Sequence, residues 1–131
     1  MSNYPLATST WDDEELKAIQ SVIDSNKYTM GDHVKSFENN FRNFINRKYS
    51  VMVSSGSAAN LLSIASLFYT NKPMLETGDE IVVPAVSWST TYFPLQQFGL
   101  KLKFVDIDIE TLNYDLEALK TSLTKKTKMI V

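Results

Sequence analysis

Two polar segments, each placed after an apolar run, carry the residues of this chain that could bind a ligand. Residues 51–53 are followed by Ser54-Ser55-Gly56-Ser57-Ala58-Ala59-Asn60, and residues 80–84 are followed by Ala85-Val86-Ser87-Trp88-Ser89-Thr90. Each segment predicts a buried strand that ends in a turn and then opens a helix. The first turn suits a phosphate, and the second presents a large aromatic ring.

The segment around Gly56 has the composition of an anion site. We expect the glycine to permit a tight turn, with the Ser57 hydroxyl and the free N–H groups of residues 57–59 pointing at a ligand. Unpaired donors and the helix dipole together attract an anion. The alternative is that Ser55 or Ser57 is an ordinary N-cap, because serine is favoured at that position in all helices.

Trp88 is the second candidate binding residue. It follows a strand, at the edge of a parallel sheet where ligands bind, and an indole can stack on a heteroaromatic ring. The alternative is a tryptophan that fills the core between helix and sheet. Its neighbours favour a polar cleft, since most carry hydroxyl groups: Ser87, Ser89, Thr90 and Thr91.

Other polar residues give weaker signals. Tyr28 and Thr29 could line a substrate entrance or form a simple turn between helices. Asp106, Asp108 and Glu110 resemble paired carboxylates, but their spacing favours loop and capping roles.

His33 is the one histidine of the chain, and it falls in the first turn of a predicted helix. We therefore expect it to be a solvated surface residue. With a single histidine, the segment offers no Ser-His-Asp arrangement. We assign no catalytic residue and no metal ligand to it.

Composition excludes several classes of protein. Of the 131 residues, 44% are hydrophobic and 21% are charged, the formal net charge is -2, and there is no cysteine. These values are typical of one globular domain and argue against nucleic-acid binding, disulfides and cysteine-ligated metals. No signal peptide or membrane-spanning run is visible, so we expect a cytoplasmic location.

The elements that must position these residues follow from the hydrophobic pattern. Residues 1–48 are predicted to be helical, with Thr10 capping a first helix, a break at residues 26–31 and a second helix over residues 32–46. Residues 49–131 alternate strands and helices. The strands are expected at residues 49–53, 80–84, 101–106 and 128–131, and the helices at residues 57–70, 89–98 and 116–123.

This alternation predicts an α/β fold with a mainly parallel sheet and helices on both faces. The helix at residues 57–70 is so apolar that we expect it to be largely buried. Pro94 must lie near the start of its helix or kink it.

These segments resemble the pyridoxal-phosphate-dependent sugar aminotransferase and dehydratase family. The resemblance rests on Ser-Ser-Gly-Ser-Ala-Ala-Asn, Gly-Asp-Glu-Ile-Val-Val-Pro-Ala-Val-Ser-Trp-Ser-Thr-Thr and Lys-Phe-Val-Asp-Ile-Asp. Residues 3–7, 9–13 and 92–97 are most similar to the family's GDP-sugar 3-dehydratases of deoxysugar and O-antigen biosynthesis. The resemblance covers the whole chain but only about the first third of a family member, the N-terminal part of the fold-type I large domain.

The resemblance implies a cofactor and its binding residues. Gly56, Ser57 and Ala58 would hold the phosphate of pyridoxal phosphate or pyridoxamine phosphate, and Trp88 would stack on the pyridine ring. It also implies a nucleotide-sugar substrate, glutamate as amino donor, and a homodimer with sites at the subunit interface.

The resemblance places the remaining catalytic groups downstream of Val131. These are the acid that partners the ring nitrogen and the base, a lysine in aminotransferases and a histidine in the dehydratase. We therefore expect a truncated chain that is inert alone. Residues 49–53 should lack their neighbouring strand, so the chain should be marginally folded unless it swaps or dimerises.

Two alternatives stay open. The chain could belong to a nucleotide-sugar 4-aminotransferase, which the identity of the downstream base would decide. It could also be a non-enzymatic α/β module that binds a phosphate or nucleotide.

Overall fold

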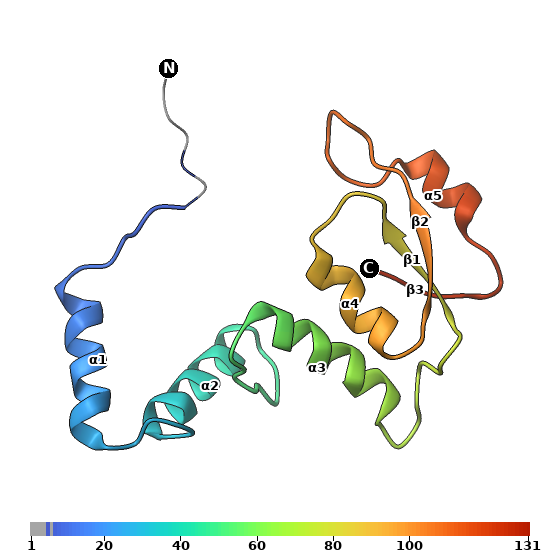
Figure 1. Ribbon diagram of the computed structural model, residues 1–131. Coiled ribbons are helices and arrows are strands. Elements are labelled where there is room, and N and C mark those ends of the chain that lie inside the picture. Colours follow the sequence, from blue (N-terminus) through green and yellow to red (C-terminus); the bar gives the residue numbers. More distant parts are fainter. Residues whose placement is uncertain (1–4, 6) are drawn as a thin grey trace. The chain divides into compact units, whose positions relative to one another are not determined.

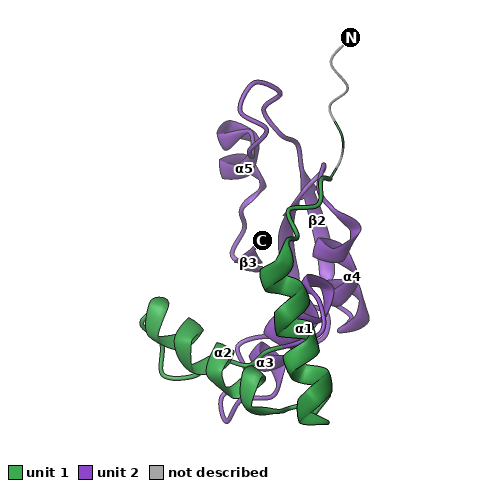
Figure 2. Cartoon of the chain, turned by 90° about the vertical axis from the view of Figure 1, so that its left-hand side faces the viewer, with its two compact units in different colours: residues 1–52 green, residues 53–131 purple. Residues whose placement is uncertain are grey.

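The computed structural model describes residue 5 and residues 7–131. Asn3, Tyr4 and Leu6 of the N-terminal motif lie outside the described residues. The chain forms two compact units, residues 1–52 and residues 53–131, coloured separately in Figure 2.

The first unit begins with helix α1 (Asp13–Ser25), which has a complete N-terminal cap. Asp12 accepts from the Glu14 amide, and the Glu15 carboxylate accepts from the Asp12 amide at 2.8 Å. The expectation that Thr10 is the cap was wrong, because this reciprocal pair fixes the helix start two residues later. The helix ends at Asn26, whose φ of 53° is left-handed.

Helix α2 (Asp32–Phe44) follows, as the sequence predicted. The Phe37 and Phe41 rings stack with their centroids 5.8 Å apart. No residue of α1 or α2 is buried. Their apolar side chains therefore form stripes that are still open to solvent in the described part of the chain.

Residues 49–53 were expected to form a strand, and this prediction was wrong: they are irregular. The Met52 amide donates to the Glu38 carboxylate of α2 at 2.8 Å instead of to a sheet. A strand needs a partner for its backbone groups, and no described strand pairs with this segment. Its apolar residues alone cannot replace that ladder.

The second unit contains a parallel sheet, with strand order β2-β1-β3, as predicted. The strands are β1 (Glu80–Pro84), β2 (Lys101–Val105) and β3 (Thr127–Ile130). Ile81, Val82 and Val83 of the central strand are all fully buried. Three consecutive buried residues indicate that both faces of β1 are covered.

Helices α4 (Ser89–Gln97) and α5 (Leu116–Ser122) make the two crossovers. The first leads from β1 to β2, and the second leads from β2 past β1 to β3. Right-handed crossovers in opposite directions place their helices on opposite faces of the sheet, as Figure 1 shows. The prediction of helices on both faces is confirmed.

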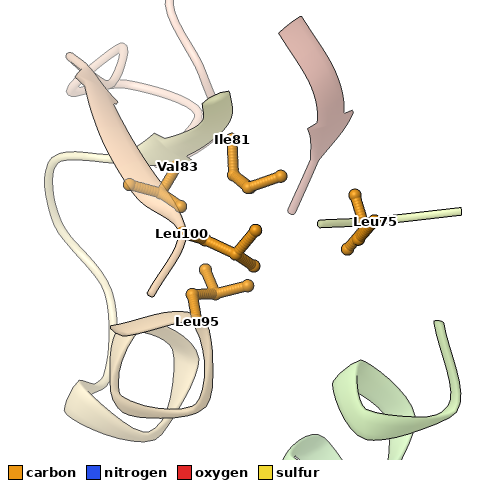
Figure 3. Packing of buried hydrophobic residues seen from close by; sticks show 5 residues of the cluster. All are labelled: Leu75, Ile81, Val83, Leu95 and Leu100. Carbon is orange, nitrogen blue, oxygen red and sulfur yellow. The ribbon is translucent and has the colours of Figure 1, made fainter. Parts of the chain in front are cut away.

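The core lies between the sheet and helices α3 (Gly56–Phe68) and α4 (Figure 3). Its buried side chains come from the loop before β1, from β1, from α4 and from the residue before β2: Leu75, Ile81, Val83, Leu95 and Leu100. Ile64 and Leu67 of α3 pack against this cluster while remaining partly exposed.

The expectation that α3 is largely buried was wrong. No α3 residue is buried, and Leu61 and Leu62 are 39% and 46% exposed. Within the described residues only one side of this largely apolar helix meets a packing partner.

Candidate cofactor site

The first turn of the candidate site is the start of α3. Ser55 is the N-cap: its Oγ accepts from the Ala58 amide at 3.2 Å, and its carbonyl accepts from the Ala59 amide at 3.0 Å. The expectation of free amides at all of residues 57–59 was therefore wrong. The amides of Gly56 and Ser57, at the first two helical positions, have no intrahelical acceptor and remain at the positive end of the helix.

Gly56 contributes space rather than an unusual conformation. Its φ is not in the left-handed region, so the turn does not depend on the conformational freedom of a glycine. A Cβ built on Gly56 would meet nothing within 4 Å. The backbone at this helix start is therefore open to close approach by an external group.

Trp88 begins the second helix of the site. It is the N-cap residue of α4, and its side chain is 77% exposed. This exposure excludes the alternative of a tryptophan that fills the core of this chain. The indole face is available for stacking.

Hydrogen bonds fix the loop that carries Trp88. The Ala85 amide donates to the Val105 carbonyl at 2.7 Å, and the Tyr92 hydroxyl donates to the Pro84 carbonyl at 2.7 Å. The loop therefore leaves β1 under restraint at both strands and returns into a helix that is tied to the end of β1. An exposed ring on a restrained backbone is suited to receive a ligand.

A hollow of about 410 Å³ lies between α3 and α4. Ser57 and Ala58 line it from α3, and Thr90 and Phe93 line it from α4. Gly56 and Trp88 are not among its lining residues, although each lies within two residues of one. The structure thus brings the two polar turns to adjoining helices, with Ser57 and Ala58 lining the hollow and Gly56 and Trp88 next to it in sequence.

Tyr28 and Thr29 lie in the first unit. They line a separate hollow of about 420 Å³ together with His33 and Met52. The Tyr28 hydroxyl donates to Asn26 Oδ1 at 3.2 Å. Their role in a substrate entrance stays a prediction.

The acidic residues after β2 serve their own loop. Asp108 accepts from the amides of Glu110 and Thr111, both at 2.9 Å, and these bonds lower the pKa of its carboxyl. Asp106 accepts from the Ile107 amide at 2.8 Å. The preference for loop roles over a paired-carboxylate site is confirmed.

Within residue 5 and residues 7–131, no group of three or more histidine, cysteine or acidic side chains could hold a metal. No helix of these residues is long and apolar enough to cross a bilayer.

Two side chains that organise the site were not predicted from the sequence. Tyr92 joins α4 to the end of β1, and Asn60 of α3 donates to the Thr90 carbonyl of α4 at 3.2 Å. Tyr92 lies one helical turn after Trp88, and this spacing could have indicated that its side chain lies near the end of β1. The Asn60 contact spans 30 residues, so local patterns could not reveal it.

The donor set fits a phosphorylated aromatic group. Two free amides and a hydroxyl stand at the positive end of α3, beside a glycine with open space above it, and an exposed indole stands at the start of α4. The first group of atoms suits a phosphate dianion, and the second suits a flat ring.

Comparisons with known proteins agree with this fit. The chain is 66% identical, over all 131 of its residues, to GDP-4-keto-6-deoxy-D-mannose 3-dehydratase from Escherichia coli O55:H7, and covers 34% of that protein. A crystal structure of GDP-4-keto-6-deoxymannose-3-dehydratase with a trapped PLP-glutamate geminal diamine matches with a TM-score of 0.91. There the identity is 66%, covering 98% of this chain and 33% of that one.

A candidate sugar aminotransferase from Streptococcus pneumoniae, in its PMP form, matches with a TM-score of 0.83 and 25% identity. The match covers 98% of this chain and 31% of the S. pneumoniae protein. The chain therefore spans about a third of the length of the relatives it matches.

The model of the DegT/DnrJ/EryC1/StrS aminotransferase family matches residues 9–131. From its fold, its two helix-opening turns and this match, the chain belongs to the DegT/DnrJ/EryC1/StrS aminotransferase family.

Proposed function

We propose that this chain is the N-terminal segment of a nucleotide-sugar 3-dehydratase that uses pyridoxal phosphate and pyridoxamine phosphate. The observation that carries the proposal is the pairing of the open α3 start with the exposed Trp88, in a chain 66% identical to such a dehydratase. The segment would supply part of the cofactor site and would be inactive alone.

Each residue of the pairing has a distinct task in this proposal. The amides of Gly56 and Ser57 and the Ser57 hydroxyl bind the cofactor phosphate, and Ala58 keeps this side of the hollow small. Trp88 stacks on the pyridine ring. When bound, the pyridoxamine form supplies an amine and an electron sink for removal of the sugar's C3 hydroxyl.

The substrate and partners follow from the relatives. The name of the E. coli relative points to a GDP-linked 4-keto-6-deoxy sugar. The PLP-glutamate adduct in the crystal structure of a GDP-4-keto-6-deoxymannose-3-dehydratase points to glutamate as the amino donor. We propose both for the complete protein, in deoxysugar synthesis for lipopolysaccharide, and a homodimer as its working form. We place the acid at the ring nitrogen and the proton-transferring base outside this segment.

A nucleotide-sugar 4-aminotransferase is the second candidate, favoured by the family to which the chain belongs and by its likeness to the S. pneumoniae protein. A histidine base in the complete protein supports the dehydratase, and a lysine supports the aminotransferase. A module that binds phosphate without catalysis ranks third.

The test is a fluorescence titration in a Trp11→Phe variant, in which Trp88 is the sole tryptophan. Pyridoxamine phosphate is the probe because it has no aldehyde and cannot react with surface lysines. We expect saturable quenching, and binding about ten- to a hundredfold weaker for pyridoxamine, which lacks the charged phosphate.

Two matched variants locate the phosphate. Ser57→Asp adds a carboxylate where the phosphate should bind and should weaken pyridoxamine phosphate binding more than about tenfold, although acids at this position favour helix formation. Ser63→Asp, six residues further along α3, should leave binding unchanged. Equal binding of the two ligands by a chain that circular dichroism shows to be folded would contradict the cofactor assignment.

A further inference from the structure

Pro94 leaves a gap in the hydrogen bonding of α4. It lies inside the helix and is buried. In an α-helix the carbonyl of residue 90 accepts from the amide of residue 94, but proline has no N–H. The Thr90 carbonyl therefore lacks the backbone N–H donor that residue 94 would otherwise provide within α4.

Asn60 of α3 meets this carbonyl from outside the helix. Its Nδ2 donates to the Thr90 oxygen at 3.2 Å. Thr90 and Pro94 both line the hollow between α3 and α4, and Ser57, one turn before Asn60, lines it from the other side. The side-chain amide thus joins the two helices beside the candidate site.

We infer that Asn60 is a positioning residue: it supplies the donor that Pro94 cannot, and so holds the Trp88 end of α4 to the Ser57 end of α3. A single asparagine therefore has two effects. It donates a hydrogen bond to the carbonyl that Pro94 leaves without a donor, and it fixes the distance between the two turns proposed to bind the cofactor. The consequence for cofactor binding depends on the proposed function, whereas the link between Asn60 and Pro94 does not.

A double-mutant cycle tests the link. Asn60→Asp keeps the shape but replaces the donor with an acceptor, while Pro94→Ala returns an N–H to position 94. In the Pro94 chain, Asn60→Asp should lower the folding equilibrium constant about five- to tenfold, the value of roughly one hydrogen bond. In the Pro94→Ala chain the same change should cost less than about twofold. Asn40→Asp, an exposed asparagine of α2, controls for the added charge.

Cofactor affinity is the second measurement on the same variants. Asn60→Asp should weaken pyridoxamine phosphate binding, followed by Trp88 fluorescence at concentrations of urea where every variant is folded, and Pro94→Ala should restore it. If the parent chain binds no pyridoxamine phosphate, the proposed function fails while the folding cycle still decides the link. An equal loss of folding stability in both backgrounds overturns the inference.

A spectrum of the unmutated chain covers the case in which Pro94→Ala does not fold. In a ¹⁵N–¹H correlation spectrum, the Asn60 side-chain amide should have one proton shifted downfield and slow to exchange. The exposed Asn40 amide should show neither property. An Asn60 pair with the shifts and exchange of Asn40 would overturn the inference without any variant.

Discussion

The two units of this chain use similar apolar residues with opposite results. In residues 53–131, Ile81, Val83 and Leu95 are fully buried. In α1, Ile19 and Ile23 are 43% and 47% exposed. Both sets occur at the spacing expected for their element, so pattern alone does not decide burial. A sheet covered on both faces supplies neighbours for every side of β1, whereas the two helices of the first unit leave every residue of their apolar stripes at least partly exposed.

The comparison also explains where the candidate site lies. Ser57 and Trp88 are exposed, but they lie at the starts of α3 and α4. These helices pack on the hydrophobic core of residues 53–131 through Ile64 of α3 and Leu95 of α4. Exposed ligand-binding groups need such a rigid support to hold their geometry. Tyr28 and Thr29 lie on the other unit, in which no residue among residue 5 and residues 7–52 is buried.

The largest expected effect contrasts two isoleucines. Ile81→Ala removes a fully buried side chain and should lower the free energy of unfolding by about 2–5 kcal/mol. Ile23→Ala, at a side chain 47% exposed, should cost less than about 1 kcal/mol. Urea unfolding followed by circular dichroism measures both. Similar losses would mean that the first unit also has a core.

A second contrast concerns two glycines. Gly99 ends α4 with a φ of 71°, and a Cβ there would lie 2.7 Å from Thr77 Cγ2, so Gly99→Ala should cost about 1–3 kcal/mol. Gly56→Ala meets open space in a helix and should leave stability unchanged or raise it by up to about 1 kcal/mol.

The same pair of glycines separates folding from binding. Gly56→Ala should weaken pyridoxamine phosphate binding because the added methyl group occupies the space proposed for the phosphate. Thermal unfolding and the fluorescence titration measure the two properties separately. A Gly56→Ala chain that unfolds as early as the Gly99→Ala chain would show that Gly56 serves the fold.

Most of the sheet could be predicted from the sequence, because residues 80–84 and 101–105 are short runs rich in β-branched and aromatic residues or leucine, each preceded by a glycine, and a helix separates them. Residues 49–53 show the limit of that reasoning. They have the composition of a strand, but a strand forms only beside a partner, and pairing is not a local property.

The candidate site could be predicted only in part. The serine-rich turn and Trp88 were visible as residue types in context. The alternative that Ser55 or Ser57 is an N-cap is confirmed for Ser55, which accepts from the Ala58 amide. The contact between Asn60 and Thr90 depends on atomic geometry that local patterns do not contain. Pro94 looked awkward in its helix because the donor that compensates for it lies on another helix.

The smallest expected effect lies within the first unit. Asp12→Ala breaks the capping box of α1 and should reduce helix stability by about 1 kcal/mol. Thr10→Ala, at the residue that the sequence favoured as the cap, should change it by less than about 0.5 kcal/mol. Helical circular dichroism during urea unfolding measures both. A larger loss for Thr10→Ala would contradict the observed helix start.

The most direct test of the contrast between the units is amide hydrogen exchange of the whole chain with and without pyridoxamine phosphate. Without ligand, residues 81–83 should exchange slowest and residues 13–25 quickly. With ligand, protection should rise at residues 56–59 and 88–91 and stay constant at residues 13–25. Two results would contradict a cofactor site supported by the hydrophobic core of residues 53–131. One is equal protection of the α1 and β1 amides from exchange, and the other is an increase in protection on ligand binding that is confined to the first unit.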